Sequence, residues 1–345
     1  MKPLNVLSLF DGMSCGQIAL NRAAIPIKNY FASENDKFAI KVTQANYPGT
    51  EQIGIVENVN AEMFKDVKID LLIGGSPCQG FSYAGKKLNF NDPRSKLFFE
   101  YVRILKELII LNPDLKFLFE NVPSNKQTIK IISDFLGVQP VVLNSNLVSA
   151  QNRVRYYWTN LRTVKKELFG FPYSDIPEPE DKKIFLKDII QNNDEVDKKY
   201  ILSDKYMKYL YEWTYSQKLK GNNFGACFRG RNDKSTTLLT SSDKGSSTFL
   251  KLDVNHKQRL NPNKASCLSG GANSGGNHSD MDILLFYNFQ DPGTSVYRRL
   301  TPIECERLQT VPDNYTNHVS DSQRYKILGN GWTVDMIVHI LSFFL

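Results

Sequence analysis

The chain lacks the features that define several common protein classes. Its five cysteines, at positions 15, 78, 227, 267 and 305, are scattered and form no Cys-x-x-Cys pair. This usage indicates neither a zinc site nor a disulfide framework, and we predict no bound metal. No segment has the length and apolarity of a membrane span, and the amino-terminal residues lack the shape of a signal peptide. We therefore expect a cytoplasmic protein with no membrane partner.

A Gly-x-Gly-x-x-Gly loop is also absent, which disfavours a dinucleotide oxidoreductase. The 345 residues are enough for one large domain and a smaller one, and 41% of them are apolar, enough for a substantial core. The formal net charge is +7. A basic balance of this kind is compatible with a polyanionic partner.

Strand-like and helix-like segments alternate through the first part of the chain. This alternation predicts an α/β fold with a mostly parallel sheet covered on both faces. Such sheets bind ligands at the carboxyl ends of their strands, where three turns stand out, at residues 10–12, 75–80 and 120–122. The predicted strands are 6–10, 29–33, 69–73, 117–119 and 140–147, and the predicted helices are 17–23, 37–46, 97–111 and 129–136.

The alternation stops near residue 165. Residues 171–180 form a proline-rich acidic linker, and the stretch from there to about 297 is polar and rich in Gly, Ser and Asn. Residues 325–345 become apolar and helical again. We therefore predict one domain from residues 1–178 and 317–345, and a smaller one from residues 179–316.

The turn after one predicted strand presents a thiol. Cys78 follows the apolar run 69–73 and the tight turn Gly-Gly-Ser-Pro. A cysteine at a strand end is well placed to act as a nucleophile, because the thiolate is intrinsically reactive. The alternative is that Cys78 is a small inert residue of the core.

Charged residues at other strand ends suit a ligand site. Glu34 follows a predicted strand, where an acid can bind ribose hydroxyls, although the residues beside it can instead cap the next helix. Glu120 ends an apolar strand and is a candidate general acid, with a solvated or salt-bridged carboxylate as the alternative. Arg153 and Arg155 alternate on a predicted strand and so point to one face. They can bind phosphate or a base carbonyl, or be ordinary surface charges.

Together these segments resemble the DNA cytosine-5 methyltransferases of the prokaryotic or phage type. The loop after the first strand, the Pro-Cys-Gln turn, Glu-Asn-Val and Gln-Asn-Arg-Val-Arg follow one another in the family's order. Residues 298–309 and 329–334 look like the family's last two motifs. The resemblance covers nearly the whole chain except about 180–297. It implies a Rossmann-like, S-adenosylmethionine-dependent DNA (cytosine-5-)-methyltransferase that acts on a cytosine flipped out of a specific duplex sequence.

The resemblance also implies roles for individual residues. Cys78 would attack carbon-6 of the cytosine, and Glu120 would engage the ring nitrogen and the exocyclic amine. Arg155, supported by Arg153, would hold the ring carbonyl. The implied S-adenosylmethionine site consists of Phe10, Asp11, Gly12, Met13, Ser14, Cys15, Glu34, Asn35, Asn58, Val59, Pro77, Leu97, Asn330, Gly331 and Trp332.

Two places depart from the family pattern. Ser14 and Cys15 stand where the first motif usually has two glycines, and Asn58 stands where an Asp commonly binds the adenine amine. An amide can still accept a hydrogen bond from that amine, without the charge. The resemblance therefore still implies S-adenosylmethionine, bound with altered affinity.

The variable stretch corresponds to the family's target-recognition region. Residues 179–316 would then be a target-recognition domain with its hinge, and residues 1–178 with 317–345 the catalytic, cofactor-binding domain. The implied partner is double-stranded DNA, bound by a monomer that is associated with the nucleoid in a prokaryote or phage-infected cell and belongs to a restriction-modification system. The candidate DNA contacts are Gln79, Ser82, Arg94, Arg229, Arg231, Lys234 and Lys264.

Two alternatives remain. One branch of the family methylates transfer RNA with the same site, but the long variable stretch and its basic polar loops favour DNA. A catalytically silent DNA-binding regulator is the other, and the intact Cys78, Glu120 and Arg155 argue against it.

Overall fold

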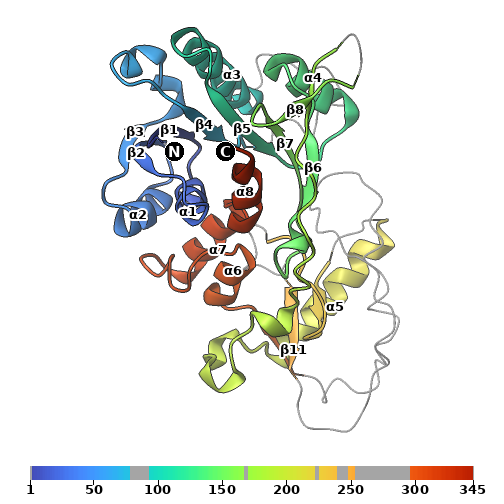
Figure 1. Ribbon diagram of the computed structural model, residues 1–345. Coiled ribbons are helices and arrows are strands. Elements are labelled where there is room, and N and C mark those ends of the chain that lie inside the picture. The colour runs from blue at the N-terminus through green and yellow to red at the C-terminus, as the bar shows by residue number, and fades with distance from the viewer. Residues whose placement is uncertain are drawn as a thin grey trace. The chain divides into compact units, whose positions relative to one another are not determined.

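The computed structural model describes residues 2–77, 93–166, 170–221, 225–238, 248–252 and 296–344 (Figure 1). The chain divides into two compact units. The first comprises Met1–Asn144, Val154–Glu180 and Gly331–Leu345, and the second comprises Ser145–Arg153 and Asp181–Asn330. Residues 145–153 and 317–330 thus belong to the second unit, which differs from the division predicted above.

A seven-stranded sheet forms the centre of the first unit, in the order β3-β2-β1-β4-β5-β7-β6 (Figure 1). β7 runs antiparallel to both of its neighbours, and the other pairs are parallel. The predicted α/β fold with a mostly parallel sheet is confirmed. The strands are β1 (Leu4–Leu9), β2 (Ile27–Ser33), β3 (Glu51–Gly54), β4 (Leu71–Gly74), β5 (Lys116–Asn121), β6 (Val141–Asn144) and β7 (Val154–Thr159).

Helices cover both faces of this sheet. α3 and α4 pack on the face that carries Leu72, in one apolar cluster with β1, β5 and β7. Successive strand residues point to opposite faces, and Ile73 meets Gly16 of α1 on the other face. α8 lies beside α1 there (Figure 1). The helices of this unit are α1 (Cys15–Arg22), α2 (Lys37–Asn46), α3 (Pro93–Leu111), α4 (Lys126–Leu136) and α8 (Val334–Leu341).

The parallel register brings the carboxyl ends of neighbouring strands to one edge of the sheet. Leu9 of β1 pairs with Ser33 of β2 and with Gly74 of β4. Gly74 in turn pairs with Phe119 of β5, and Ser33 pairs with Gly54 of β3. The turns that follow these five strands therefore open at the same edge, where ligands of such sheets bind.

The second unit has a core of its own. A small sheet in the order β10-β11-β12 contributes Phe228, Phe249 and Tyr297, which cluster with Leu202 and Leu210. The elements of this unit are α5 (Asp204–Leu219), β10 (Cys227–Arg229), β11 (Thr248–Leu252), β12 (Val296–Arg299), α6 (Pro302–Leu308) and α7 (Asp321–Asn330). Two short strands, β8 (Thr163–Val164) and β9 (Tyr173–Ser174), pair in the first unit.

Contrary to the expectation from the sequence, one segment, Asp321–Phe344, does have the length and composition of a membrane-spanning helix. In the structure it consists of α7, α8 and a final short turn, and the chain leaves helical conformation at residues 331–333. The buried residues of α8 are Val334, Met336, Ile337, Ile340 and Leu341. The apolar composition of α8 is thus explained by burial within the protein.

Candidate active site

Glu120 lies at the carboxyl end of β5, and the residue is 8% exposed. Arg155 of β7 places its Nε 2.9 Å from Glu120 Oε1. Trp332 donates its indole N–H to Glu120 Oε2 at 3.1 Å. The antiparallel pairing of β5 with β7 sets the first contact, because Glu120 lies opposite Tyr157 and Arg155 is two residues before Tyr157 on β7. Both carboxylate oxygens of Glu120 are therefore held by donors.

Gly75 lies against this carboxylate. A Cβ at position 75 would lie 2.9 Å from Glu120 Oε2 and 3.1 Å from Glu120 O. Asn121 approaches the next residue, Ser76, with its Nδ2 3.5 Å from the Ser76 carbonyl oxygen. The end of β4 thus runs beside Glu120, and the absence of a side chain at position 75 permits the approach.

Several predicted site residues lie outside the part of the chain that the structure describes. These are Cys78, Gln79, Ser82 and Lys264, and the side chain of Arg94. Pro77 is the last described residue before this gap and is exposed.

Arg153 takes a different position from Arg155. β7 begins at Val154, so Arg153 lies one residue before the strand that carries Arg155. The Arg153 guanidinium donates to the carbonyl oxygens of Leu238 (3.2 Å) and Gly329 (3.3 Å), both in the second unit with it. Arg155 is accordingly the arginine that contacts the candidate catalytic carboxylate.

The loop after β1 is organised around Glu34. Gly12, with φ +61°, donates its N–H to Glu34 Oε2 at 2.7 Å. The N–H groups of Asn35 and Asp36 donate to Glu34 Oε1. Helix α2 is capped by Asp36, which accepts from the N–H of Phe38. Glu34 is therefore not the cap of α2, and its carboxylate ties the loop after β1 to the end of β2.

Ser14 has φ +65° and precedes α1. This left-handed conformation favours glycine, because other residues bear a steric cost there. The family motif that the sequence resembles usually has glycine at this position, and the backbone of Ser14 supplies a physical reason. Cys15, which follows, is buried in the first turn of α1.

Asp11 is a buried carboxylate in the same loop. Tyr30 donates its hydroxyl to Asp11 Oδ1 at 2.8 Å, and the buried Asp11 Oδ2 has no hydrogen-bond partner among the residues that the structure describes. Burial raises the pKa of Asp11 to about 6, and the nearby charge of Glu34 acts in the same direction. Asp11 Oδ2, at the carboxyl edge of the sheet, can therefore accept a hydrogen bond from a donor group of a bound molecule.

The other predicted cofactor residues differ in exposure. Val59 is buried, and its carbonyl oxygen accepts from Arg103 Nη2 at 2.7 Å, whereas the side chain of Asn58 is exposed. Leu97 packs against the apolar cluster under α3. Phe10, Met13 and Gly331 are at least partly buried, Asn35 is exposed, and Asn330 is exposed at the end of α7 in the second unit.

Lys234 is engaged inside the second unit. Its Nζ donates to the carbonyl oxygens of Asn146 (2.6 Å), Ile184 (2.8 Å) and Ser149 (3.3 Å), and burial lowers its pKa. These three acceptors use all the donors of an ammonium group. The bonding opposes the prediction that Lys234 contacts DNA, and we assign this lysine to the stability of the unit.

Arg229 is 6% exposed, which leaves little of its side chain for phosphate, whereas Arg231 is partly exposed. Sequence reasoning also missed buried ion pairs in this unit. Both Nη atoms of Arg298 donate to Glu304, at 2.7 and 2.6 Å. In the sequence, the only indication of this pair is that both residues lie within 298–309, the segment that resembles the family's penultimate motif.

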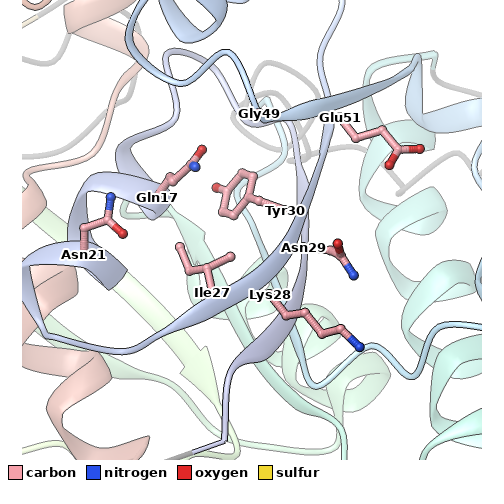
Figure 2. Close-up of a pocket in the computed structure, with 8 residues that line it drawn as sticks. All are labelled: Gln17, Asn21, Ile27, Lys28, Asn29, Tyr30, Gly49 and Glu51. Atoms are coloured by element: carbon pink, nitrogen blue, oxygen red, sulfur yellow. The ribbon is translucent and has the colours of Figure 1, made fainter.

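A cavity of about 320 Å³ lies in the first unit, lined by residues of α1 and β2 among others, and Figure 2 shows the side chains that line it. Tyr30, which lines it, also donates to Asp11, but the cavity contains none of the predicted site residues. Its lining consists of Gln17, Asn21, Ile27, Lys28, Asn29, Tyr30, Gly49 and Glu51. Among the described residues, no cluster of three or more His, Cys, Asp or Glu side chains could hold a metal ion.

Comparison with known proteins finds similarity to one family over nearly the full length of this chain. Residues 4–343 match the family described as C-5 cytosine-specific DNA methylase. The chain is 30% identical to the type II methyltransferase M1.ScrFI of Lactococcus lactis subsp. cremoris, covering 96% of this chain and 75% of that protein. It is 29% identical to the type II methyltransferase M.HpaII of Haemophilus parainfluenzae, covering 96% and 86%.

The fold is similar to that of solved structures at lower identity. The methyltransferase EhMeth of Entamoeba histolytica superposes with a TM-score of 0.68 at 18% identity, covering 100% of this chain and 98% of that one.

Proposed function

The chain belongs to the C-5 cytosine-specific DNA methylase family, and on that premise we propose that it methylates carbon-5 of a cytosine flipped out of a specific sequence in duplex DNA. It is a DNA (cytosine-5-)-methyltransferase. The observation that carries the proposed chemistry is the buried Glu120 carboxylate, held by Arg155 at the carboxyl edge of the sheet.

In this proposal the base is activated by addition of a thiolate. The sulfur of Cys78 forms a bond to carbon-6, which moves electron density to carbon-5. Glu120 engages the ring nitrogen and the exocyclic amine and stabilises the charge that develops on attack. Arg155 donates to the ring carbonyl. Loss of the carbon-5 proton after methylation restores the ring double bond and expels the Cys78 thiolate.

S-adenosylmethionine supplies the electrophilic methyl group when it is bound, and the described residues fit it. The orphaned Asp11 Oδ2 suits the cationic amine of the methionine part. Glu34 accepts three backbone N–H groups, and a carboxylate has about four lone-pair sites, so that one remains for a ribose hydroxyl. Asn58 follows β3 at the same edge of the sheet. In this proposal its side chain contacts the adenine.

We further propose that the enzyme acts as a monomer on double-stranded DNA in the cytoplasm, associated with the nucleoid, and that it belongs to a restriction-modification system. Residues of the second unit would read the target sequence. Arg231 is the described candidate for a phosphate contact, because it is partly exposed, whereas Arg229 is buried and the Lys234 ammonium donates to three carbonyl oxygens.

Bisulfite sequencing of plasmid DNA from cells that express the chain tests the reaction and identifies the target. We expect one short sequence context to be protected with the wild type and none with Cys78→Ser. Duplex DNA carrying 5-fluorocytosine at that target should form a stable covalent adduct that maps to Cys78, because fluorine blocks the final proton loss. Methylated transfer RNA with unmodified DNA would contradict the proposal.

A further inference from the structure

We propose that Trp332 is a positioning residue for Glu120, whose carboxylate it orients toward the target base together with Arg155. The inference rests on the proposed function of Glu120. The sequence resemblance assigns Trp332 to the cofactor, whereas its indole N–H points at the carboxylate that would contact the base.

The two donors engage different oxygens of Glu120. Arg155 Nε lies 2.9 Å from Oε1, and Trp332 Nε1 lies 3.1 Å from Oε2. Gly75 closes the remaining side, since a Cβ there would lie 2.9 Å from Oε2 and 3.4 Å from the indole nitrogen. With an oxygen fixed on each side, the carboxylate plane cannot rotate freely about the last side-chain bond.

Trp332 has a firm support of its own. It precedes Thr333, the buried N-cap residue of α8. The helix is anchored by its buried apolar face and by an ion pair between Arg22 of α1 and Asp335. Trp332 thus lies in the short segment between α7 and α8, one residue before the N-cap of an anchored helix.

The chemistry of the two donors explains why this arrangement matters. Indole and guanidinium N–H groups donate and cannot accept, so neither competes for the exocyclic amine of the base. A carboxylate whose plane is set before the base arrives requires no reorganisation when charge develops. A small displacement of the Glu120 carboxylate would weaken its contact with the base in the transition state more than it would weaken binding of the base in the ground state.

Steady-state kinetics of Trp332→Phe test the inference. Phenylalanine keeps an aromatic ring and removes the donor. We expect kcat to fall about tenfold, the effect of losing one hydrogen bond to a charged group at the transition state. The KM for S-adenosylmethionine and the KM for DNA should change by less than about twofold. A raised KM for the cofactor with unchanged kcat would make Trp332 a cofactor contact and overturn the inference.

Trp158→Phe is the matched control. Trp158 is likewise in the first unit, where it is buried, and its indole donates to Ser133 Oγ at 3.0 Å rather than to Glu120. This variant loses a bond of the same kind, so we expect a lower melting temperature with kcat within about twofold of the wild type. An equal loss of kcat in both variants would mean general destabilisation and would refute positioning. An inactive wild type would instead defeat the proposed function.

Nuclear magnetic resonance of the wild type and Glu120→Gln gives a test that does not depend on the folding of Trp332→Phe. The chain has three tryptophans and so three indole N–H resonances, which Trp158→Phe and Trp213→Phe assign by elimination. We expect Glu120→Gln to move the Trp332 resonance and leave the Trp158 and Trp213 resonances in place. An unmoved Trp332 resonance would show that no hydrogen bond joins the two side chains in solution.

Discussion

Asp11 illustrates at the scale of a single residue how burial sets the chemistry of a carboxylate. Burial raises its pKa to about 6, although the hydroxyls of Ser8, Tyr30 and Ser14 act in the opposite direction. In the free protein the group is therefore protonated below pH 6 and ionised above it. A proton on Asp11 would remove the charge that we propose for binding the amine of S-adenosylmethionine.

Cofactor affinity should consequently depend on pH. We expect the dissociation constant for S-adenosylmethionine to rise about tenfold for each pH unit below 6 and to be flat above about 7. Asp11→Asn should bind weakly and lose this dependence, because an amide does not titrate. Calorimetry from pH 5 to 8 measures both effects, and a wild-type affinity that stays constant over this range would exclude Asp11 from the site.

The same pKa shift has the opposite effect on the stability of the free protein. The native state holds a proton on Asp11 that the unfolded chain releases, so the free energy of unfolding falls as pH rises from about 4 to about 6. Asp11→Asn removes this cost and should raise the free energy of unfolding at pH 7.5 by up to about 3 kcal/mol. Urea denaturation without cofactor measures it. A less stable variant would mean that the buried charge is compensated.

We expect substitution of two basic residues, Lys234 and Arg231, to have different effects, on stability and on DNA binding respectively. Lys234→Gln should lower the free energy of unfolding by about 1.5–3 kcal/mol, because it leaves buried carbonyl oxygens without a charged donor. Arg231→Gln should weaken DNA binding, with the salt-dependence slope reduced by about one. Fluorescence anisotropy at several salt concentrations, together with urea denaturation, separates the two effects. A reduced salt slope in a stable Lys234→Gln would restore Lys234 as a DNA contact.

At the scale of the secondary-structure elements, Gly75, which follows β4, lies against Glu120 at the end of β5. The two strands pair in parallel up to Gly74 and Phe119, so the residues that follow, Gly75 and Glu120, emerge together. The small separation between Gly75 and the Glu120 carboxylate is a property of two elements, not of either residue alone.

Gly75→Ala should disturb the carboxylate without disturbing the fold. The added Cβ would lie 2.9 Å from Glu120 Oε2 and would push it away from its donors. We expect kcat to fall at least about tenfold, while the melting temperature changes little. Gly49→Ala is the control, because a Cβ there meets no atom within 4 Å. Equal kcat values for the two variants would show that the position of Glu120 is not critical.

On the scale of the whole molecule, the second unit includes the turn between β6 and β7. Residues 145–153 bond within that unit, through Asn152 N to Ser235 O (2.9 Å) and through the carbonyl oxygens that hold Lys234. The unit that we propose to read DNA is therefore discontinuous in sequence, and a single cut at the linker does not isolate it.

Domain exchange should follow these structural boundaries. Replacing residues 145–153 and 181–330 together with the equivalents of a family member of different specificity should yield a folded enzyme that methylates the donor's target. Exchanging only residues 179–316 separates Lys234 from two of its three acceptors, the carbonyl oxygens of Asn146 and Ser149, and we expect lower stability. Bisulfite sequencing reports the target and thermal denaturation the stability. A folded, active chimera of the first kind that retains the original target would show that specificity lies elsewhere.

Local patterns were sufficient to predict most strands and helices of the first unit, although the predicted strand 140–147 is shorter in the structure, where β6 ends at Asn144. The predicted helix 37–46 coincides with α2, and the apolar runs lie within or beside β1, β2, β4 and β5. α3 begins earlier than predicted, at Pro93, because proline is tolerated in a first helical turn. Hydrophobic alternation, capping residues and strand-end turns depend on a few neighbouring residues, so one sequence is enough to identify them.

Pairings between distant residues depended on the tertiary structure. Glu120 and Trp332 are 212 residues apart, and nothing in either local motif specifies that one donates to the other. Lys234 and Arg231 look equally available to DNA in the sequence, yet only folding surrounds Lys234 with three carbonyl oxygens. Such contacts follow from how sheets and helices pack, and packing brings together residues whose separation along the chain carries no information about their distance in space.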